Sequence, residues 1–290
     1  MRGKPDIVFF GNEPPFLDIL GVMGRVKAVV AHAQNKRASR YFGSARDWAK
    51  NRGVPVIMPE EYLEKPLETD LGVVFGFGKL LPHRVRTVCR LGMINIHQSL
   101  LPAYRGRHPL NWAIINGEHE SGVTVHHADN RFDTGAIITQ HVISIGPDDT
   151  ALDLHWATVA AGKKALAKAL QMVGTHAFSG QPQDDRQSTY FPARKPTDGR
   201  IDFKRSAQEI QNLVRALVPP WPGAYFYKQG RKVVLDRVEL LPDEVGEGLR
   251  PGSTFEHFGH ICIKAGQGAL VLEKTRNTLP PICRIARTEK

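Results

Sequence analysis

The stretch KAVVAHAQNKRASRYFGSARDWAKNRGVPVIM, residues 27–58, places a helical pattern between two short apolar runs. Its ends, KAVVAH and VPVIM, are typical of buried strands. Between them lies SARDWAKNRG, in which Ser44 can cap a helix and Gly53 can end it. A strand, a helix and a strand at this spacing predict a β-α-β unit, and therefore a parallel sheet.

The same alternation continues on both sides of this stretch. DIVFF (residues 6–10) and GVVFGF (residues 72–77) are further apolar runs that predict strands. A long helix is predicted from residue 150 to 174, where Thr150 and Asp153 have the spacing of a capping box. We therefore predict an α/β fold with a Rossmann-like, mostly parallel sheet over residues 1–180.

The composition changes in SGQPQDDRQSTYFPARKPTDGR, which is polar and interrupted by proline and glycine. This change predicts a linker over residues 181–205. The helical pattern SAQEIQNLVRAL follows, and then two predicted hairpins at residues 223–240 and 260–275. A short helix followed by hairpins predicts a small C-terminal β-barrel domain of the OB-like kind over residues 206–290.

Several classes of protein are excluded by what the sequence lacks. No apolar run approaches the roughly 20 residues that span a bilayer, so no membrane partner is expected. The three cysteines, Cys89, Cys262 and Cys283, are scattered, which favours a reducing cytoplasm. The turn FFGNEPPF has one glycine where a dinucleotide fingerprint needs three, and no phosphate-binding P-loop is present. His126 and His127 are adjacent and point to opposite faces of a strand, so no metal is expected.

Positive charge is unevenly distributed. The formal net charge is +10, and residues 71–117 contain no Asp or Glu. This acid-free segment carries six basic residues, Lys79, Arg84, Arg86, Arg90, Arg105 and Arg107. Clustered positive charge attracts anionic ligands. The segment therefore favours a nucleotide, a poly-acid cofactor or the phosphates of RNA as its partner.

Within that segment, MINIH (residues 93–97) predicts a strand that ends in polar side chains. Asn95 and His97 project to the same side because side chains two residues apart share a face. Both can donate to a developing oxyanion, and an imidazole can also move a proton. Asp133, in the loop ADNRFDTG, could orient the histidine and favour its charged form. No Ser or Cys nucleophile is paired with a base here, which favours direct attack by a substrate amine.

NIHQSLLPAYRG and GEHESGVTVHHADNRFDTGAII resemble the formyltransferase superfamily that uses N10-formyltetrahydrofolate. The pattern of that family is N-x-H-x-S-L-L-P, followed by D-x-G in a loop about 36 residues after the histidine. Asn95, His97 and Asp133 match it. PTDGRIDFKRSAQEIQNLVRALVPPWPGAYF is similar to the linker and C-terminal barrel of the two-domain members.

The resemblance implies an enzyme in which an amine attacks the formyl carbon of the folate. Asn95 and His97 would stabilise the tetrahedral oxyanion, His97 would manage the proton, and Asp133 would help to deprotonate the amine. N10-formyltetrahydrofolate would be the co-substrate. Its site maps by resemblance onto Lys79, Leu80, Leu81, Arg107, Asp129, Asn130, Arg131 and Phe132. The resemblance also implies a homodimer.

Members of the family differ in the amine that they formylate. Methionyl-tRNA formyltransferases share the two-domain plan, with R-G-A-A-P after S-L-L-P and a longer basic insertion after the second strand. YRGRHPLNWAIINGE and NKRASRYFGSARDWAKNRGVPV are closer to the enzyme half that acts on UDP-4-amino-4-deoxy-L-arabinose. The predicted acceptor is therefore a nucleotide-linked amino sugar.

Two alternatives stay open at this point. Lys36, Arg37 and Arg40 keep the segment after the second strand basic, which is compatible with a tRNA acceptor. A different class of function, a non-catalytic RNA-binding module, would rest on the basic C-terminal segment and would show a steep loss of affinity with salt.

Overall fold

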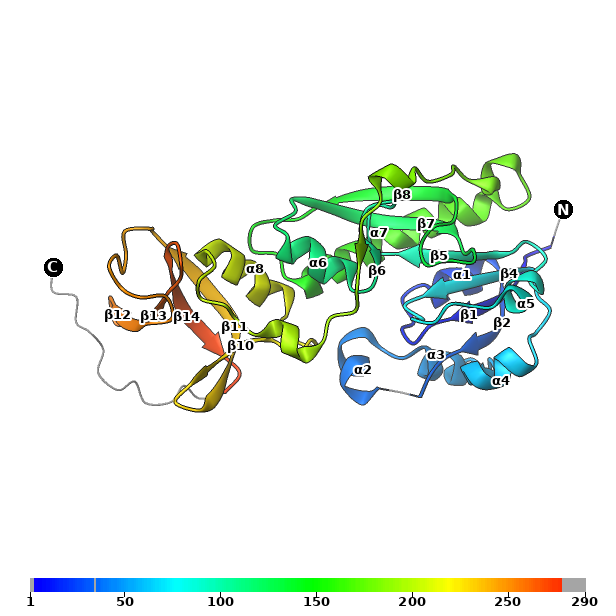
Figure 1. Cartoon of the computed structure of the whole chain (residues 1–290). Coiled ribbons are helices and arrows are strands. Elements are labelled where there is room, and N and C mark those ends of the chain that lie inside the picture. Colours follow the sequence, from blue (N-terminus) through cyan, green and yellow to red (C-terminus); the bar gives the residue numbers. More distant parts are fainter. Residues whose placement is uncertain (1–2, 34, 278–290) are drawn as a thin grey trace. The chain divides into compact units, whose positions relative to one another are not determined.

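The computed structural model describes residues 3–33 and 35–277, so Cys283 and the end of the predicted barrel domain lie outside the described residues. The chain divides into two compact units (Figure 1). The first contains residues 1–109, 120–144 and 155–192, and the second contains residues 110–119, 145–154 and 193–290. The predicted boundaries at residues 180 and 205 stay a prediction.

A seven-stranded sheet forms the centre of the first unit, in the order β3-β2-β1-β4-β5-β7-β8. Its strands are β1 (Asp6–Phe10), β2 (Arg25–Val30), β3 (Val56–Ile57), β4 (Leu71–Phe75), β5 (Met93–His97), β7 (Glu120–His127) and β8 (Ile137–Ser144). The first five are parallel, whereas β7 and β8 run antiparallel to their neighbours. The predicted mostly parallel sheet is confirmed.

Helices cover both faces of this sheet, which explains why its central strands β1 and β4 are almost entirely buried. The helices and short 3-10 turns of the first unit are α1 (Leu17–Met23), α2 (Lys36–Phe42), α3 (Ala45–Asn51), α4 (Pro59–Glu64), α5 (His83–Thr87), most of α7 (Ala151–Met172), η1 (His176–Ser179) and η2 (Asp185–Gln187). Side chains of α1, α3 and α7 pack on the face that carries Ile94 and Ile96. Side chains of α4 and α5 pack on the face that carries Met93.

Two helix starts follow the predicted capping. The Ser44 hydroxyl accepts a hydrogen bond from the Asp47 backbone amide at the start of α3. At the start of α7, the Asp153 carboxylate accepts from the Thr150 amide at 3.0 Å and from its hydroxyl at 2.6 Å. These side chains satisfy amides that a helix leaves without internal partners.

The predicted linker contains ordered structure. Its strand β9 (Tyr190–Phe191) pairs in parallel with β6 (Arg105–Gly106), which follows the S-L-L-P motif. Gly106 has a φ of 98°, and a Cβ at this position would lie 2.3 Å from the Phe191 carbonyl oxygen. Only glycine allows the two segments to approach this closely.

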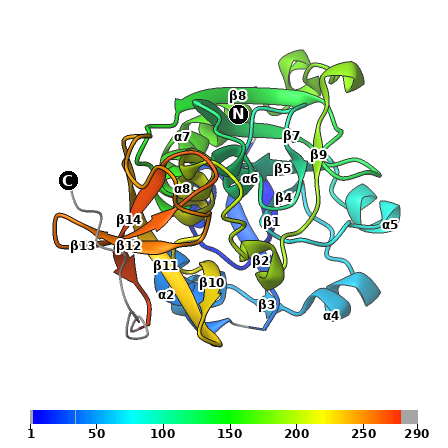
Figure 2. The same ribbon diagram turned by 60° about the vertical axis from the view of Figure 1, so that its left-hand side comes forward.

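The second unit contains a five-stranded antiparallel sheet in the order β10-β11-β14-β13-β12 (Figure 2). Its elements are α6 (Pro109–Ile115), the 3-10 turn η3 (Pro196–Gly199), α8 (Ala207–Ala216), β10 (Ala224–Lys228), β11 (Arg231–Leu241), β12 (Thr254–His257), β13 (His260–Lys264) and β14 (Ala269–Thr275). Both predicted hairpins are confirmed. Within the described residues the strand order leaves β10 and β12 at the two edges, so a closed barrel is not shown.

None of the helices in residues 3–33 and 35–277 is long and apolar enough to cross a membrane.

Candidate active site

Strand β5 places Asn95 and His97 on the face of the sheet that Met93 shares, opposite Ile94 and Ile96. The neighbouring strand β7 lies antiparallel, with His126 opposite Asn95 and Thr124 opposite His97. Residues directly opposite one another on paired strands share a face. One face of two adjacent strands therefore carries four polar side chains.

Asp133 reaches this face from the loop between β7 and β8. The φ angle of Asp133 is 60°, a backbone conformation that residues other than glycine rarely adopt. The loop is closed by Asp129, whose carboxylate accepts from the Thr134 hydroxyl at 2.7 Å and from the Arg131 amide at 3.0 Å. Asp133 and His97 are both buried, at 8% and 7% exposure. The predicted D-T-G motif is thus a turn that aims one carboxylate at the strand.

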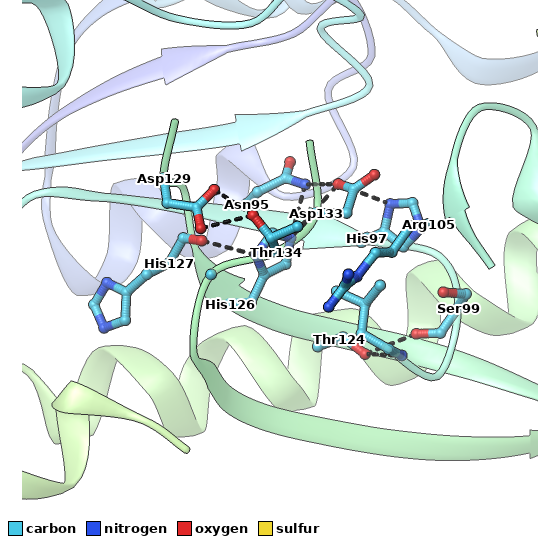
Figure 3. A network of polar contacts seen from close by, with 12 residues as sticks. Asn95, His97, Ser99, Arg105, Thr124, His126, His127, Asp129, Asp133 and Thr134 are labelled. Atoms are coloured by element: carbon cyan, nitrogen blue, oxygen red, sulfur yellow. Dashed lines mark hydrogen bonds and ion pairs between the residues drawn. The ribbon is translucent and has the colours of Figure 1, made fainter. Parts of the chain in front are cut away.

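The three predicted catalytic residues converge (Figure 3). Asp133 Oδ1 lies 3.2 Å from Asn95 Nδ2 and 3.4 Å from His97 Nδ1. Its second oxygen, Oδ2, accepts from the Gly106 backbone amide at 2.9 Å. One carboxylate oxygen therefore faces both candidate oxyanion donors, and the other anchors the carboxylate to β6.

The hydrogen bonds of His97 fix the position of one of its protons. His97 Nε2 lies 2.8 Å from the Tyr104 carbonyl oxygen, which can only accept. Nε2 therefore carries a hydrogen, and the other ring nitrogen, Nδ1, faces Asp133. The imidazole is held by the backbone on one side, and its free side faces the carboxylate.

His126 also belongs to the site, although in the sequence it stands out only as one of two adjacent histidines. Its Nδ1 lies 2.8 Å from the His127 carbonyl oxygen and its Nε2 lies 3.1 Å from Asn95 Nδ2. Burial lowers the pKa of His126 to about 4, so the ring is neutral at pH 7. Nδ1 donates and Nε2 accepts, so the Asn95 amide nitrogen donates to both His126 and Asp133. In the sequence, Thr124 and His126 alternate with the apolar Val123 and Val125, and this pattern could have indicated a polar face on this strand.

Residues of the predicted linker hold the Asp133 loop in place. The Gln183 amide nitrogen donates to the carbonyl oxygens of Asp133 and Gly135 at 2.9 and 2.8 Å. Its amide oxygen accepts from Arg105, which is 4% exposed and also forms an ion pair with Asp185 at 2.8 Å. Arg105 thus has a structural role beside the site, and no sequence pattern indicated it.

The S-L-L-P motif is shaped by a buried hydroxyl on β7. Thr124 donates to the Ser99 carbonyl oxygen at 2.7 Å and accepts from the Leu101 amide at 3.2 Å and the Gln140 side chain at 2.9 Å. The Ser99 hydroxyl in turn donates to the Ala103 carbonyl oxygen at 2.8 Å. These bonds turn the chain directly after His97.

The cluster of an amide, an imidazole and a carboxylate around one point suits acyl transfer, and the sequence identifies the family. Residues 25–170 match the formyl transferase family, and residues 194–282 match the formyl transferase C-terminal domain. The chain belongs to the formyl transferase family. The motif residues Asn95, His97 and Asp133 lie in the first matched region.

Solved structures with the same fold agree with this membership. One is an N-formyltransferase from Helicobacter canadensis, solved with folinic acid and dTDP-3-aminofucose; it is 23% identical, with 92% of this chain and 98% of that chain covered and a TM-score of 0.70. A second is WlaRD, a sugar 3N-formyl transferase solved with dTDP and 5-N-formyl-THF, at 22% identity, 96% and 100% coverage and a TM-score of 0.68. A third is HypX from Aquifex aeolicus with tetrahydrofolic acid, at 18% identity, 94% and 44% coverage and a TM-score of 0.64.

The residues predicted to bind the co-substrate of this formyl transferase lie in two segments. Arg107 donates to the Gly78 carbonyl oxygen, so it contacts the segment that contains Lys79, Leu80 and Leu81. Leu80 is 45% exposed and Leu81 is buried. The other segment, Asp129 to Phe132, is the loop that carries Asp133, and its Phe132 is 40% exposed.

Most of the basic side chains in the acid-free segment have partners within this formyl transferase. Lys79 pairs with Glu60 at 2.9 Å and Arg90 with Asp70 at 2.9 Å, while Arg84 donates to the Leu63 carbonyl oxygen. Within the described residues, no group of three or more His, Cys, Asp or Glu side chains could hold a metal ion.

Proposed function

We propose that this formyl transferase moves a formyl group from N10-formyltetrahydrofolate to the amine of a nucleotide-linked amino sugar, by direct attack through a tetrahedral intermediate. The observation that carries the proposal is the convergence of Asn95 Nδ2 and His97 Nδ1 on one oxygen of Asp133. Two donors that meet at one point can stabilise a single negatively charged oxygen.

The substrate amine attacks the formyl carbon, so a new C–N bond forms and the formyl oxygen becomes an oxyanion. Asn95 Nδ2 and His97 Nδ1 donate to that oxyanion in place of Asp133 Oδ1. Because Nε2 keeps the hydrogen that it donates to Tyr104, His97 acts here with a hydrogen on both ring nitrogens. Their present contacts to Oδ1, at 3.2 and 3.4 Å, are the longest that these two side chains make in the cluster. Catalytic hydrogen bonds are often long before substrate binds. These two contacts are therefore the ones that a substrate replaces.

The proton of the attacking amine goes to the Asp133 carboxylate, which lies beside His97. The bond from carbon to N10 of the folate then breaks, N10 takes up the Nδ1 proton of His97, and Asp133 passes the amine proton on to His97, which restores both groups. His126 holds the Asn95 amide from behind and stays neutral. No Ser or Cys participates, so no acyl-enzyme forms in this scheme.

The co-substrate and the acceptor are supported by different observations. The Asp129 to Phe132 loop directly precedes Asp133. Arg107 follows Gly106, whose amide donates to Asp133, and it contacts Gly78 beside the Lys79 to Leu81 segment. These two segments form the proposed folate site. The solved relatives were crystallised with folinic acid, 5-N-formyl-THF or tetrahydrofolic acid. Two of them are sugar enzymes or carry a dTDP-amino sugar, which supports the amino-sugar acceptor. We also propose an OB-like closure of the second sheet, a homodimer and a cytoplasmic location.

A methionyl-tRNA acceptor is the second candidate, and one observation favours it. Helix α2 contains Lys36, Arg37 and Arg40, and none of its residues is buried. Exposed basic side chains on a short helix after β2 could contact phosphates of RNA.

The test of the catalytic assignment is steady-state formylation of UDP- and dTDP-linked amino sugars with N10-formyltetrahydrofolate. We expect Asn95→Ala to lower kcat by about 10²–10³, the usual loss for one oxyanion donor. His97→Ala and Asp133→Asn should lower kcat at least as much. His141→Ala, an exposed histidine on β8, is the matched control and should stay near wild type. Near-normal turnover by His97→Ala would contradict the mechanism.

A further inference from the structure

Outside the cluster around Asp133, two buried polar groups face each other without a hydrogen bond. Glu13 lies in the loop after β1, and His155 lies in the first turns of α7. Glu13 Oε2 and His155 Nε2 are 3.7 Å apart. Both atoms are buried, and neither has a hydrogen-bond partner among the described residues. Buried polar atoms in folded proteins are nearly always paired, so this exception requires an explanation.

The hydrogen bonds around His155 show which of its nitrogens carries a hydrogen. The Thr158 hydroxyl donates to the His155 carbonyl oxygen at 2.8 Å, so it accepts from the Gln98 amide nitrogen at 2.7 Å. The same Gln98 nitrogen lies 3.2 Å from His155 Nδ1, which therefore accepts. Burial lowers the pKa of His155 to about 4, so the ring is neutral at pH 7. The hydrogen is consequently on Nε2 and points toward Glu13.

A donor thus faces an acceptor across a gap that is too long for a hydrogen bond. A purely structural pair would close this gap. A hydroxyl group would satisfy both atoms at once, because it donates one hydrogen bond and accepts another.

The location of the pair connects it to the reaction. Strand β1 has β2 on one side and β4 on the other, so the loop after β1 lies at the point where the strand order reverses. Ligands of open α/β sheets bind at the carboxyl ends of the strands at such points. Gln98, which holds the His155 ring, directly follows His97 in the chain.

An aromatic side chain at the end of a short helix packs on His155. The Phe42 ring lies 4.4 Å from the His155 ring, centroid to centroid, and Phe42 ends α2, in which no residue is buried. The Glu13 side chain keeps 27% of its surface exposed, whereas the His155 side chain keeps 5%. The partly exposed Glu13 side chain is therefore the side of the pair from which a ligand group has access.

We propose that Glu13 and His155, oriented by Gln98, form an acceptor subsite that binds a hydroxyl group of the amino sugar. The Glu13 carboxyl oxygen accepts from the hydroxyl, and His155 Nε2 donates to it. This assignment rests on the proposed function, because the sugar is the substrate that brings such a hydroxyl to the carboxyl ends of the strands.

The test compares Glu13→Ala with Glu13→Gln in the full chain. We expect Glu13→Ala to raise KM for a UDP- or dTDP-linked amino sugar by about tenfold, the loss of one hydrogen bond. Its kcat and its KM for N10-formyltetrahydrofolate should stay within about twofold of wild type, by the same reasoning. Glu13→Gln keeps an acceptor oxygen and should restore part of the affinity. Glu61→Ala, an exposed glutamate on α4, is the matched control and should change nothing.

Two further readouts separate a subsite from a structural pair. Because Glu13 Oε2 has no partner, Glu13→Ala should not lower Tm. The second readout uses a series of acceptors, each of which lacks one hydroxyl group. One of them should bind to wild type more weakly than the complete acceptor does, and should bind to Glu13→Ala as well as the complete acceptor does. The loss of affinity that removing this hydroxyl causes in wild type would then be absent in the variant.

Three results would overturn the assignment. An unchanged acceptor KM in Glu13→Ala, with active wild type, would mean that the pair binds a buried water only and would leave the proposed function intact. A lower Tm together with a uniform loss of activity would show a structural role. If wild type binds folate and formylates no amino sugar, the proposed function fails and the subsite fails with it.

Discussion

At the scale of single residues, the geometry of the site depends on backbone groups as much as on the predicted side chains. Asp133 is aligned by the Gly106 amide, and His97 by the Tyr104 carbonyl oxygen. Asn95, His97 and Asp133 were predictable because their side-chain chemistry and spacing carry the signal. The Tyr104 and Gly106 contacts were not, because any residue type has an amide and a carbonyl, and their positions depend on the fold.

The glycine of D-T-G offers a test of this alignment. A Cβ on Gly135 would lie 1.8 Å from the His127 carbonyl oxygen, so Gly135→Ala must move the loop. We expect kcat to fall by about 10² or more, since misplacement of a catalytic group by 1 Å can cost that much. Gly3→Ala, where a Cβ has nothing within 4 Å, is the matched control. Wild-type kcat in Gly135→Ala would show that the position of Asp133 is not critical.

The free energy of unfolding should depend on pH because the Glu13 carboxyl is buried. Burial raises the pKa of Glu13 from 4.5 to about 7. Between these values the folded state holds a proton that the unfolded state has released, so stability falls as pH rises through this window. The destabilisation caused by ionising the buried Glu13 is absent below about pH 4.5 and complete above about pH 7.

Glu13→Gln cannot ionise and should escape this penalty. One pKa unit corresponds to about 1.4 kcal/mol, so the variant should gain up to ~3 kcal/mol over wild type at pH 8 and nothing at pH 4.5. Partial exposure of the side chain reduces that gain. Chemical denaturation of both proteins at the two pH values measures the difference. A stability difference between the two proteins that is the same at both pH values would show that folding does not raise the pKa of the Glu13 carboxyl.

At the scale of elements, the sequence predicted the strands, the helix starts and both C-terminal hairpins, because each has a local signal. In the linker, the local sequence did not predict the contacts that its residues make. Its polar, proline-rich composition predicted a connection, whereas Gln183 and Asp185 hold the Asp133 loop and Arg105. These contacts join residues about 50 and 80 positions apart in the chain, and no periodicity within one segment encodes them.

The capping box of α8 gives a prediction at this scale. The Ser206 hydroxyl accepts from the Glu209 amide at 3.2 Å, and the Glu209 carboxylate accepts from the Ser206 amide at 2.9 Å. Ser206→Ala should lower the free energy of unfolding by about 1 kcal/mol. Ser253→Ala, in the loop before β12, is the control. Equal unfolding curves for the two variants would show that the cap contributes no stability.

At the scale of the whole molecule, the net charge of +10 raised the question of an anionic partner. Three of the six basic side chains in the acid-free segment pair with acids outside it: Lys79 with Glu60, Arg90 with Asp70 and Arg105 with Asp185. Composition alone could not show this, because the acids are distant in sequence. What distinguishes the two acceptors is therefore chemistry at the site and not overall charge.

The central claim is that this formyl transferase acts on an amino sugar. The most direct measurement offers wild-type protein N10-formyltetrahydrofolate together with UDP- or dTDP-linked amino sugars and methionyl-tRNA, and follows each product by mass spectrometry. We predict that the amino sugar gains a formyl group while the tRNA stays unmodified, and that His97→Ala abolishes formylation of the sugar. Formylation of methionyl-tRNA with no formylated sugar would contradict it.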